Sequence, residues 1–257
     1  MKIHFVKYQG TGNDFIAIDG REHPFDPKNG LPAKMCDRRF GIGADGIIVV
    51  SEHNEYDFHL DYYNPDGSSS LCGNGTRCAI HFAQSLGMLK GGNTTFMAFD
   101  GVHEGEILPD GLIKLKMNDV GEVRNISDGD FADTGSPHLV RMVDDLENTD
   151  VMGIGRDLRY NAPIDGGTNV NFVERKREGE ISVRTYERGV ENETLSCGTG
   201  VTACAIIAGG NNGPVKINTR GGGLQVDFKK LPDNTYSEIF LTGPAAAVFE
   251  GTYTING

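Results

Sequence analysis

Two cysteines in matching surroundings are the residues best suited to carry out chemistry. Cys72 and Cys197 each open a Cys-Gly-x-Gly motif, and an apolar stretch typical of a helix follows each motif. The first turn of a helix has backbone N–H groups without internal partners, which together with the helix dipole favour a negative charge. A thiol there ionises more readily than a free thiol, and glycine lets a ligand approach the amides. Each motif therefore predicts a reactive thiol beside a site for a carboxylate.

A pair of such thiols suits the inversion of a tetrahedral carbon that carries an acidic hydrogen. This reaction needs a base on one face of the carbon and an acid on the other. If Cys72 and Cys197 lie on either side of one substrate, one acts as thiolate base and the other as thiol acid. The amides of both helix starts would stabilise the charge of the carbanion. We therefore predict that these two cysteines are the catalytic residues of an amino-acid epimerase or racemase.

The remaining cysteines, Cys36, Cys78 and Cys204, are predicted to pack in the core, as free cysteines commonly do. An odd number of cysteines without an export signal indicates reduced thiols. The sequence has no Cys-x-x-Cys pair and its seven histidines are scattered, so no metal site is predicted.

One stretch resembles a nucleotide-binding motif but stands in the wrong context. Residues 41–46 read Gly-Ile-Gly-Ala-Asp-Gly, which matches the dinucleotide fingerprint literally. That fingerprint requires a strand before it and a helix after it. Here a predicted helix precedes it and the predicted strand Ile47–Val50 follows. We therefore predict no nucleotide cofactor, and no other cofactor motif is present.

Composition limits the possible partners. The 257 residues carry a formal net charge of −12, and the isoelectric point is about 5.0. An acidic surface repels phosphate backbones and anionic lipids, so neither nucleic acid nor a membrane is an expected partner. No window is as long and apolar as a membrane span. We expect a cytoplasmic protein that acts on a small molecule.

An internal repeat predicts two homologous domains that face each other. Residues 61–87 and 184–210 both read as a strand ending in tyrosine, a polar loop, a Cys-Gly-x-Gly motif and an apolar helix. The agreement of four features in one order is much stronger than a match of the motif alone. We place the first domain at 1–116 and the second at 117–247. The final strand, 248–257, is predicted to return to the first domain, because duplicated folds often exchange a terminal segment.

The rest of the chain is rich in strands and poor in helices. A short helix is predicted at 31–39 and one helix after each motif cysteine. Strands are predicted by alternating or β-branched patterns in most other segments, namely 3–19 (with a turn), 46–52, 57–64, 96–101, 102–108, 112–117, 123–127, 131–143, 168–176, 180–189, 215–220, 224–228, 238–243 and 246–254.

The motifs together resemble the diaminopimelate epimerase family over nearly the whole chain. NPDGSSSLCGNGTR at 64–77 and ERGVENETLSCGTG at 187–200 are similar to its two signatures, and GTGNDF, GIGADG, TGSPHLV and GGTNVNF follow its order. The resemblance implies an α/β (α+β) fold of two homologous domains, each a curved, mostly antiparallel sheet wrapped around a central helix. It also implies epimerisation of LL-diaminopimelate to meso-diaminopimelate for lysine and peptidoglycan precursors, without pyridoxal phosphate or metal, by a homodimer.

The same resemblance implies roles for residues that match the family's motifs. Cys72 and Cys197 match its catalytic cysteines, and His138 and Ser136 match supporting positions. The residues that match substrate-binding positions are Asn13, Asn64, Gly73, Asn74, Asn169, Glu187, Arg188, Gly198 and Thr199. This chain departs from the family pattern in two places, since Ser136 stands where members often have asparagine and Gly46 where some have glutamine. Taken singly, the asparagines could serve turns, His138 could be a loop residue, and Glu187 and Arg188 could form a surface ion pair.

Other functions remain open on the sequence alone. A proline or hydroxyproline racemase of the same fold also uses two cysteines. A protein of another class could use Cys72 and Cys197 as a redox-switchable disulfide, or bind an amino acid without catalysis.

Overall fold

The computed structural model describes residues 2–22, 24–70, 72–210 and 212–255. The chain divides into two compact units, Met1–Leu115 with Gly243–Gly257, and Lys116–Thr242. The sequence-based division placed the first boundary after residue 116 and the returning segment at 248. Among the described residues, no helix has the length and apolar character needed to cross a membrane.

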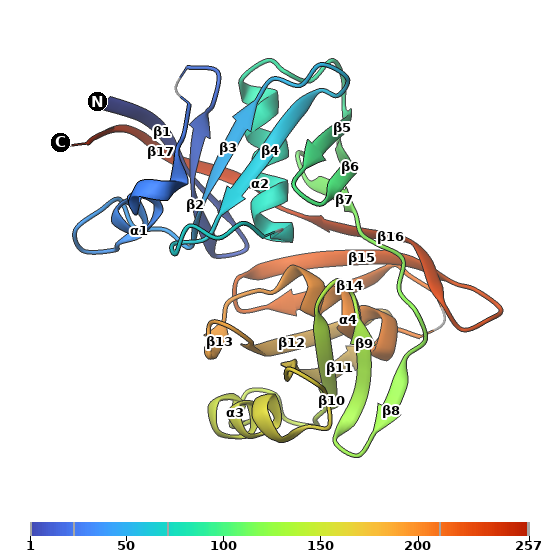
Figure 1. Cartoon of the computed structure of the whole chain (residues 1–257). Coiled ribbons are helices and arrows are strands. Elements are labelled where there is room, and N and C mark those ends of the chain that lie inside the picture. The colour runs from blue at the N-terminus through green and yellow to red at the C-terminus, as the bar shows by residue number, and fades with distance from the viewer. Residues whose placement is uncertain (1, 23, 71, 211, 256–257) are drawn as a thin grey trace. The chain divides into compact units, whose positions relative to one another are not determined.

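The first unit is a mixed sheet with one central helix (Figure 1). Its strands are β1 (Lys2–Gly10), β2 (Asn13–Asp19), β3 (Gly46–Ser51), β4 (Phe58–Tyr63), β5 (Asn93–Ala98), β6 (Gly101–Ile107), β7 (Ile113–Lys116) and β17 (Ala246–Thr254). Its helices are the short 3-10 helix Pro27–Asn29, α1 (Leu31–Cys36) and α2 (Gly73–Ser85). The strand order is β17-β1-β2-β3-β4-β5-β6-β7, and only β2–β3 and β4–β5 pair in parallel.

The second unit has a sheet of the same kind. Its strands are β8 (Arg124–Ile126), β9 (Gly129–Asp133), β10 (Pro137–Met142), β11 (Asn169–Arg177), β12 (Glu180–Glu187), β13 (Asn192–Thr194), β14 (Val215–Thr219), β15 (Gly222–Lys230) and β16 (Tyr236–Gly243). Its helices are α3 (Val151–Asn161) and α4 (Gly198–Ala208). The order is β8-β9-β10-β11-β12-β14-β15-β16, with β13 also on β12, and only β10–β11 and β12–β14 are parallel.

The two sheets therefore repeat one topology, with the short strand β13 as an addition in the second unit. The parallel pairs β2–β3 and β4–β5 of the first unit correspond to β10–β11 and β12–β14 of the second. In each unit, the helix that follows the motif cysteine connects the strands of the latter pair. The helices α1 and α3 lie in the crossover of the first parallel pairing. The C-terminal strand β17 occupies in the first unit the edge that β8 occupies in the second. The predicted duplication of a mostly antiparallel fold is confirmed.

Each sheet surrounds its central helix. The helix α2 packs against β1, β2, β3, β4, β6 and β17, and α4 against β9, β10, β11, β12, β14 and β15. Almost every residue of α4 is buried, which explains its apolar sequence on all sides. Cys78 and Cys204 lie in these helices and are fully buried, as predicted for packing thiols.

The helix α3 was absent from the elements predicted above. Its glycines, Gly153 and Gly155, lower helix propensity and hid the periodic pattern. A helix-start signal was nevertheless present, because the side chain of Asp150 accepts a hydrogen bond from the Gly153 backbone N–H at 2.8 Å. A Cβ at Gly155 would lie 2.6 Å from the Cβ of Tyr186, so glycine there lets α3 approach β12.

We expect the first sheet to depend strongly on its stacked phenylalanines. Phe58 and Phe96 face each other across the parallel strands β4 and β5, with ring centroids 4.7 Å apart. Phe96→Ala should lower the free energy of unfolding by about 3–5 kcal/mol, because it leaves a cavity in a fully buried site. Chemical denaturation measures this loss. The matched control Phe99→Ala, at a side chain 58% exposed, should change it by less than about 0.5 kcal/mol; equal losses in the two variants would contradict the prediction.

Candidate active site

Both motif cysteines cap the N-terminus of a buried central helix. Cys72 has φ −116° and ψ 114°, and Cys197 has φ −119° and ψ 115°. The backbone oxygen of Cys72 accepts from the Thr76 N–H at 2.7 Å, and that of Cys197 from the Val201 N–H at 2.9 Å. The extended cap conformation starts each helix directly after the sulfur-bearing residue. The sequence prediction of a thiol at each helix start is therefore confirmed.

Glycine at the fourth position of each motif serves packing. A Cβ at Gly200 would lie 2.6 Å from the Asn171 side-chain oxygen, and one at Gly75 would lie 3.2 Å from the Tyr62 ring. The start of each helix thus lies close to its sheet. In the second unit this closeness brings buried polar side chains to the helix start.

In the first unit, Cys72, Asn13 and Asn74 form what we call the first half-site. The thiol of Cys72 donates to the Asn13 side-chain oxygen at 3.4 Å. The Asn74 amide donates to the same oxygen at 3.3 Å. Asn13 comes from the start of β2 and Asn74 from the first turn of α2. Three residues that the sequence named as site residues are therefore brought together here.

A fully buried arginine lies beside this half-site. Arg77 donates to the Asn74 side-chain oxygen at 3.0 Å, to the Thr11 hydroxyl at 3.1 Å and to the Pro244 backbone oxygen at 3.4 Å. Its Nη1 is buried without a hydrogen-bond partner. Burial lowers the pKa of Arg77, whereas negative charge on Cys78 or Cys72 raises it. A buried guanidinium cation stabilises negative charge on the groups around it.

Asp45, in the Gly41–Gly46 segment, binds the side-chain nitrogen of Asn13. The Asn13 amide donates to the carboxylate of Asp45, and Arg38 donates to that carboxylate at 2.6 Å. Arg38 also binds Asp14 through both terminal nitrogens, at 2.7 and 3.0 Å. Burial alone would raise the pKa of Asp14, but the bonds from Arg38 and Lys7 lower it to about 2. The literal Gly-x-Gly-x-x-Gly segment thus supplies a carboxylate that orients a site residue.

In the second unit, Cys197, Thr199 and His138 form the second half-site. The Cys197 sulfur lies 3.6 Å from the Thr199 hydroxyl, which lies 2.9 Å from His138 Nε2. His138 is wholly buried in β10, and its Nδ1 accepts from the Asn171 amide at 3.1 Å. Burial, aided by the charge of Arg188, lowers the pKa of His138 to about 3. The imidazole is therefore neutral at physiological pH.

Asn169, Ser136 and Arg188 lie together in the second unit. The Asn169 amide donates to the Ser136 hydroxyl at 3.0 Å and to the Pro137 backbone oxygen at 2.9 Å. Its side-chain oxygen accepts from the Arg188 backbone N–H at 2.9 Å. Asn169 therefore positions the backbone at the end of β12, where Glu187 is the last residue and Arg188 follows. The Ser136 hydroxyl is thus an acceptor for this asparagine.

Asn64 forms hydrogen bonds within its own loop, and Gly46 packs against Tyr62. The Asn64 amide donates to the hydroxyls of Ser68 and Ser70, at 3.0 and 3.1 Å, within the loop before Cys72. A Cβ at Gly46 would lie 2.4 Å from the Tyr62 hydroxyl. The tyrosine therefore fills the space that a glutamine at Gly46 would need.

The three packing cysteines differ chemically from a reactive thiol. Burial raises the pKa of Cys36 and of Cys78 to about 12, and raises that of Cys204 well above its ordinary value. None of the five cysteines forms a disulfide. Within the part of the chain that the structure describes, no group of three or more His, Cys, Asp or Glu side chains is arranged to hold a metal ion.

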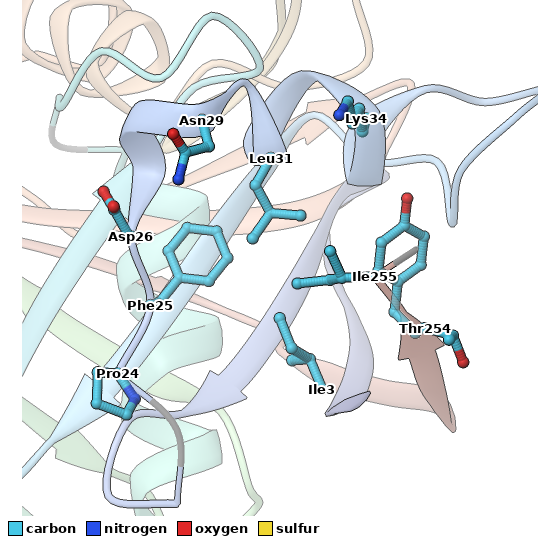
Figure 2. Close-up of a pocket in the computed structure, with 10 residues that line it drawn as sticks. Ile3, Pro24, Phe25, Asp26, Asn29, Leu31, Lys34, Thr254 and Ile255 are labelled. Carbon is cyan, nitrogen blue, oxygen red and sulfur yellow. The ribbon is translucent and has the colours of Figure 1, made fainter. Parts of the chain in front are cut away.

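A cavity of about 410 Å³ lies elsewhere in the first unit (Figure 2). Phe25, Leu31, Ile3 and Ile255 supply its apolar wall, and Figure 2 shows Asp26, Asn29 and Lys34 around it. None of the predicted site residues lines it. The cavity is therefore separate from the first half-site.

Several residues that organise the half-sites were not singled out in the sequence. They are Thr11, Asp45, Arg77 and Asn171. Two of them left a signal in the sequence. Apart from His81, Arg77 is the one residue of α2 whose side chain can carry a charge at neutral pH. Asn171 lies two positions after Asn169 in the same strand, so both side chains are on one face of the sheet. Asp45 and Thr11 lie in the GIGADG and GTGNDF motifs, but their roles could not be read from these motifs, because their partners are distant in sequence.

Comparison with known proteins identifies the family. The model of the diaminopimelate epimerase family matches residues 5–123 and 131–248. A diaminopimelate epimerase of Flavobacterium psychrophilum is 48% identical over 98% of this chain and 100% of its own length. One from Chlorobaculum tepidum is 39% identical over 96% of this chain and 99% of its own.

Solved structures of lower identity share the fold. A phenazine biosynthesis protein of the PhzF family from Bacillus anthracis has a TM-score of 0.80 at 14% identity, covering 99% of this chain and 100% of that one. A hydroxyproline epimerase of Agrobacterium vitis, with bound trans-4-hydroxy-L-proline, has a TM-score of 0.67 at 16% identity, covering 98% and 92%. With the family model matching most of both units and relatives of this identity along the full length, the chain belongs to the diaminopimelate epimerase family.

Proposed function

We propose that the protein is an isomerase that converts LL-diaminopimelate to meso-diaminopimelate, with Cys72 and Cys197 as its acid and base. The observation that carries this proposal is the repeat of one arrangement, a thiol at the N-cap of a buried helix, in both halves of a member of this family. Two groups of the same chemistry suit a reaction that must run on both faces of one carbon.

The chemical step transfers one proton in and one proton out. The thiolate of one cysteine takes the α-hydrogen as a proton and becomes a thiol, while the C–H electron pair stays on the α-carbon. The thiol of the other cysteine then delivers its proton to the opposite face and becomes a thiolate. The net change is inversion at one carbon, and the thiols have exchanged protonation states.

Substrate binding follows the same repeat. The backbone N–H groups at the starts of α2 and α4, with Gly73, Asn74, Gly198 and Thr199, would hold the carboxylate at the reacting carbon, as helix starts do for anions. Arg188 and Glu187, with Asn13, Asn64 and Asn169, would serve the remaining polar groups of the substrate. The bonds of Asn169 to Ser136 and to the Arg188 backbone support a positioning role in this set.

We also propose the compartment, the oligomeric state and the partners of the enzyme. Cysteines that form no disulfides and an acidic net charge of −12 suit a cytoplasmic enzyme with a small-molecule substrate. The family resemblance supports a homodimer. Neither a nucleic acid nor a membrane is a proposed partner, and thiol acid–base chemistry at a carbon next to a carboxylate needs no cofactor.

The substrate is tested by offering two amino acids side by side. In deuterium oxide with a reductant, LL-diaminopimelate should yield the meso isomer and gain deuterium at its α-carbon, while L-proline should remain unchanged. Nuclear magnetic resonance measures both. Turnover of proline alone would assign a proline racemase, and tight binding of diaminopimelate without exchange would assign a binding protein; either result would refute the proposal.

The catalytic pair is tested by replacing each thiol. Cys72→Ser and Cys197→Ser should each reduce epimerisation by at least about 100-fold, because a hydroxyl is far less acidic than a thiol and general acid–base groups contribute factors of this size. Steady-state assays measure the loss, and circular dichroism confirms the fold. Cys78→Ala and Cys204→Ala, in the same two helices, are matched controls that should keep activity. Near-normal turnover by either serine variant would rule out the two-thiol mechanism.

A further inference from the structure

The turn that carries Arg188 is held by its own backbone and by side chains around it. It runs from Glu187 to Glu191, and the Glu191 N–H donates to the Glu187 backbone oxygen at 2.8 Å. Glu191 has a positive φ of 56°, which residues with a Cβ rarely adopt. The Asn169 side chain binds the Arg188 N–H. A turn with such a backbone keeps one conformation only where the surrounding structure fixes it.

The Glu191 carboxylate is the centre of these contacts. One oxygen accepts from the Gly189 backbone N–H at 3.0 Å and from Arg159 Nε at 3.2 Å. The other accepts from the Tyr186 hydroxyl at 3.4 Å, and the Tyr160 hydroxyl also bonds to this carboxylate. The bond from Gly189 lowers the pKa of Glu191 more than burial raises it, so the group is ionised at neutral pH. The carboxylate thus joins the turn to the helix α3 and to the strand β12.

Arg159 reaches a second loop from its place in α3. Its Nη1 donates to the Gly166 backbone oxygen at 3.3 Å, and its guanidinium carbon lies 4.8 Å from the centre of the Tyr160 ring. A Cβ at Gly167 would overlap Arg159 Nη1, so this loop passes directly over the guanidinium. The Arg159 side chain is only 14% exposed. Arg159 therefore bridges the Glu187–Glu191 turn and the loop that leads into β11.

The packing of α3 brings Arg159 to this position. Gly155 lies four residues earlier, on the same face of the helix, and lets α3 approach Tyr186 in β12. Since Tyr186 directly precedes the turn, the next residue along this face reaches the turn itself. The helix α3 therefore supports the end of β12 with two residues, one that makes room and one that binds.

Both bridged segments carry residues that we propose to bind substrate. The loop leads to Asn169, and the turn contains Arg188. Arg188 Nη1 donates to the Gly167 backbone oxygen at 3.4 Å, so both guanidiniums bind the same loop. A guanidinium is a rigid planar fork, and anchoring one nitrogen orients the plane through which it would bind a carboxylate. Arg159 and Glu191 thus act on Arg188 through its backbone and through this loop.

We propose that Arg159 and Glu191 are positioning residues, which hold the Arg188 guanidinium in the orientation that binds a substrate carboxylate before the substrate arrives. This inference rests on the proposed function, in which Arg188 serves a polar group away from the reacting carbon. Replacing either residue should leave the two thiols and the helix starts in place. Binding should therefore weaken while the chemical step keeps its rate, because the lost interaction is the same in the ground state and the transition state.

Steady-state kinetics with LL-diaminopimelate test the two residues. Arg159→Met and Glu191→Gly should each raise KM at least about tenfold and change kcat less than about twofold, as expected for the loss of a charged hydrogen bond used only in binding. Glycine suits the positive φ at this position, so the effect of Glu191→Gly does not come from backbone strain. Glu191→Gln keeps an acceptor for the Gly189 N–H and should raise KM less, by about threefold. An unchanged KM in Arg159→Met and Glu191→Gly, or a loss confined to kcat, would overturn the proposal.

The matched control is an arginine–glutamate pair at the other end of β12. Arg177 Nε lies 2.6 Å from the Glu180 carboxylate, and Arg177→Met should keep KM within about twofold of the wild-type value, because exposed ion pairs contribute little. The double variant Arg159→Met/Glu191→Gly should raise KM no more than the larger single effect, since the two residues act through one set of contacts. Additive losses would refute this shared role.

Amide hydrogen exchange measures the turn without substrate. Peptide mass spectrometry follows residues 187–191 in the free protein, where the N–H groups of Arg188, Gly189 and Glu191 are hydrogen-bonded. Arg159→Met and Glu191→Gly should each speed their exchange at least about tenfold, because local opening requires less free energy. Arg177→Met should leave it unchanged. Equal exchange in all four proteins would refute the fixing of the turn.

The two measurements separate this inference from the proposed function. If the wild-type protein does not exchange the α-hydrogen of diaminopimelate while amide exchange responds as stated, the proposed function fails and the fixing of the turn stands. If epimerisation is normal while neither KM nor amide exchange responds to the variants, the positioning role fails and the proposed function stands.

Discussion

A helix enclosed by a sheet can present little more than its ends, and this constraint governs both units. The flanks of α2 and α4 pack against six strands each, so their functional groups must stand at the first turn. The N–H groups of that turn have no partner within the helix and favour negative charge. Cys72 and Cys197 stand at these positions with nearly equal backbone angles. Burial, which gives the protein its stability, thus leaves the two helix starts as the places where we propose that the reaction occurs.

Polar side chains next to a buried helix start must satisfy one another, and the units do this differently. The first uses the buried cation Arg77, linked through amides to a carboxylate at Asp45. The second uses a neutral imidazole at His138, held by Asn171. A duplicated backbone therefore carries two unlike electrostatic environments.

Much of the fold and of the site could be predicted from local patterns. The repeat around Cys72 and Cys197 predicts two similar domains, and the apolar stretches after them predict buried helices. The periodic pattern did not predict α3. Glycine is needed at Gly155 because α3 packs closely against Tyr186, and a tertiary contact of this kind is not visible in the periodicity of a single sequence. The pattern also missed Asp45 as an organiser, since its partner Asn13 lies 32 positions away. Arg77 was missed as well, because its partners Thr11 and Pro244 lie 66 and 167 positions away and approach it only once the unit has folded.

The edge strand β17 has a consequence for biosynthesis. It pairs with β1 along nearly its whole length, so the first residues of the chain are completed by nearly the last. On the ribosome, the N-terminal unit emerges early with the edge of β1 unpaired, whereas the second unit has all its own strands before β17 is made. The unit that is begun first is therefore completed after the other, and until β17 is made its open edge is exposed to pairing with other nascent chains.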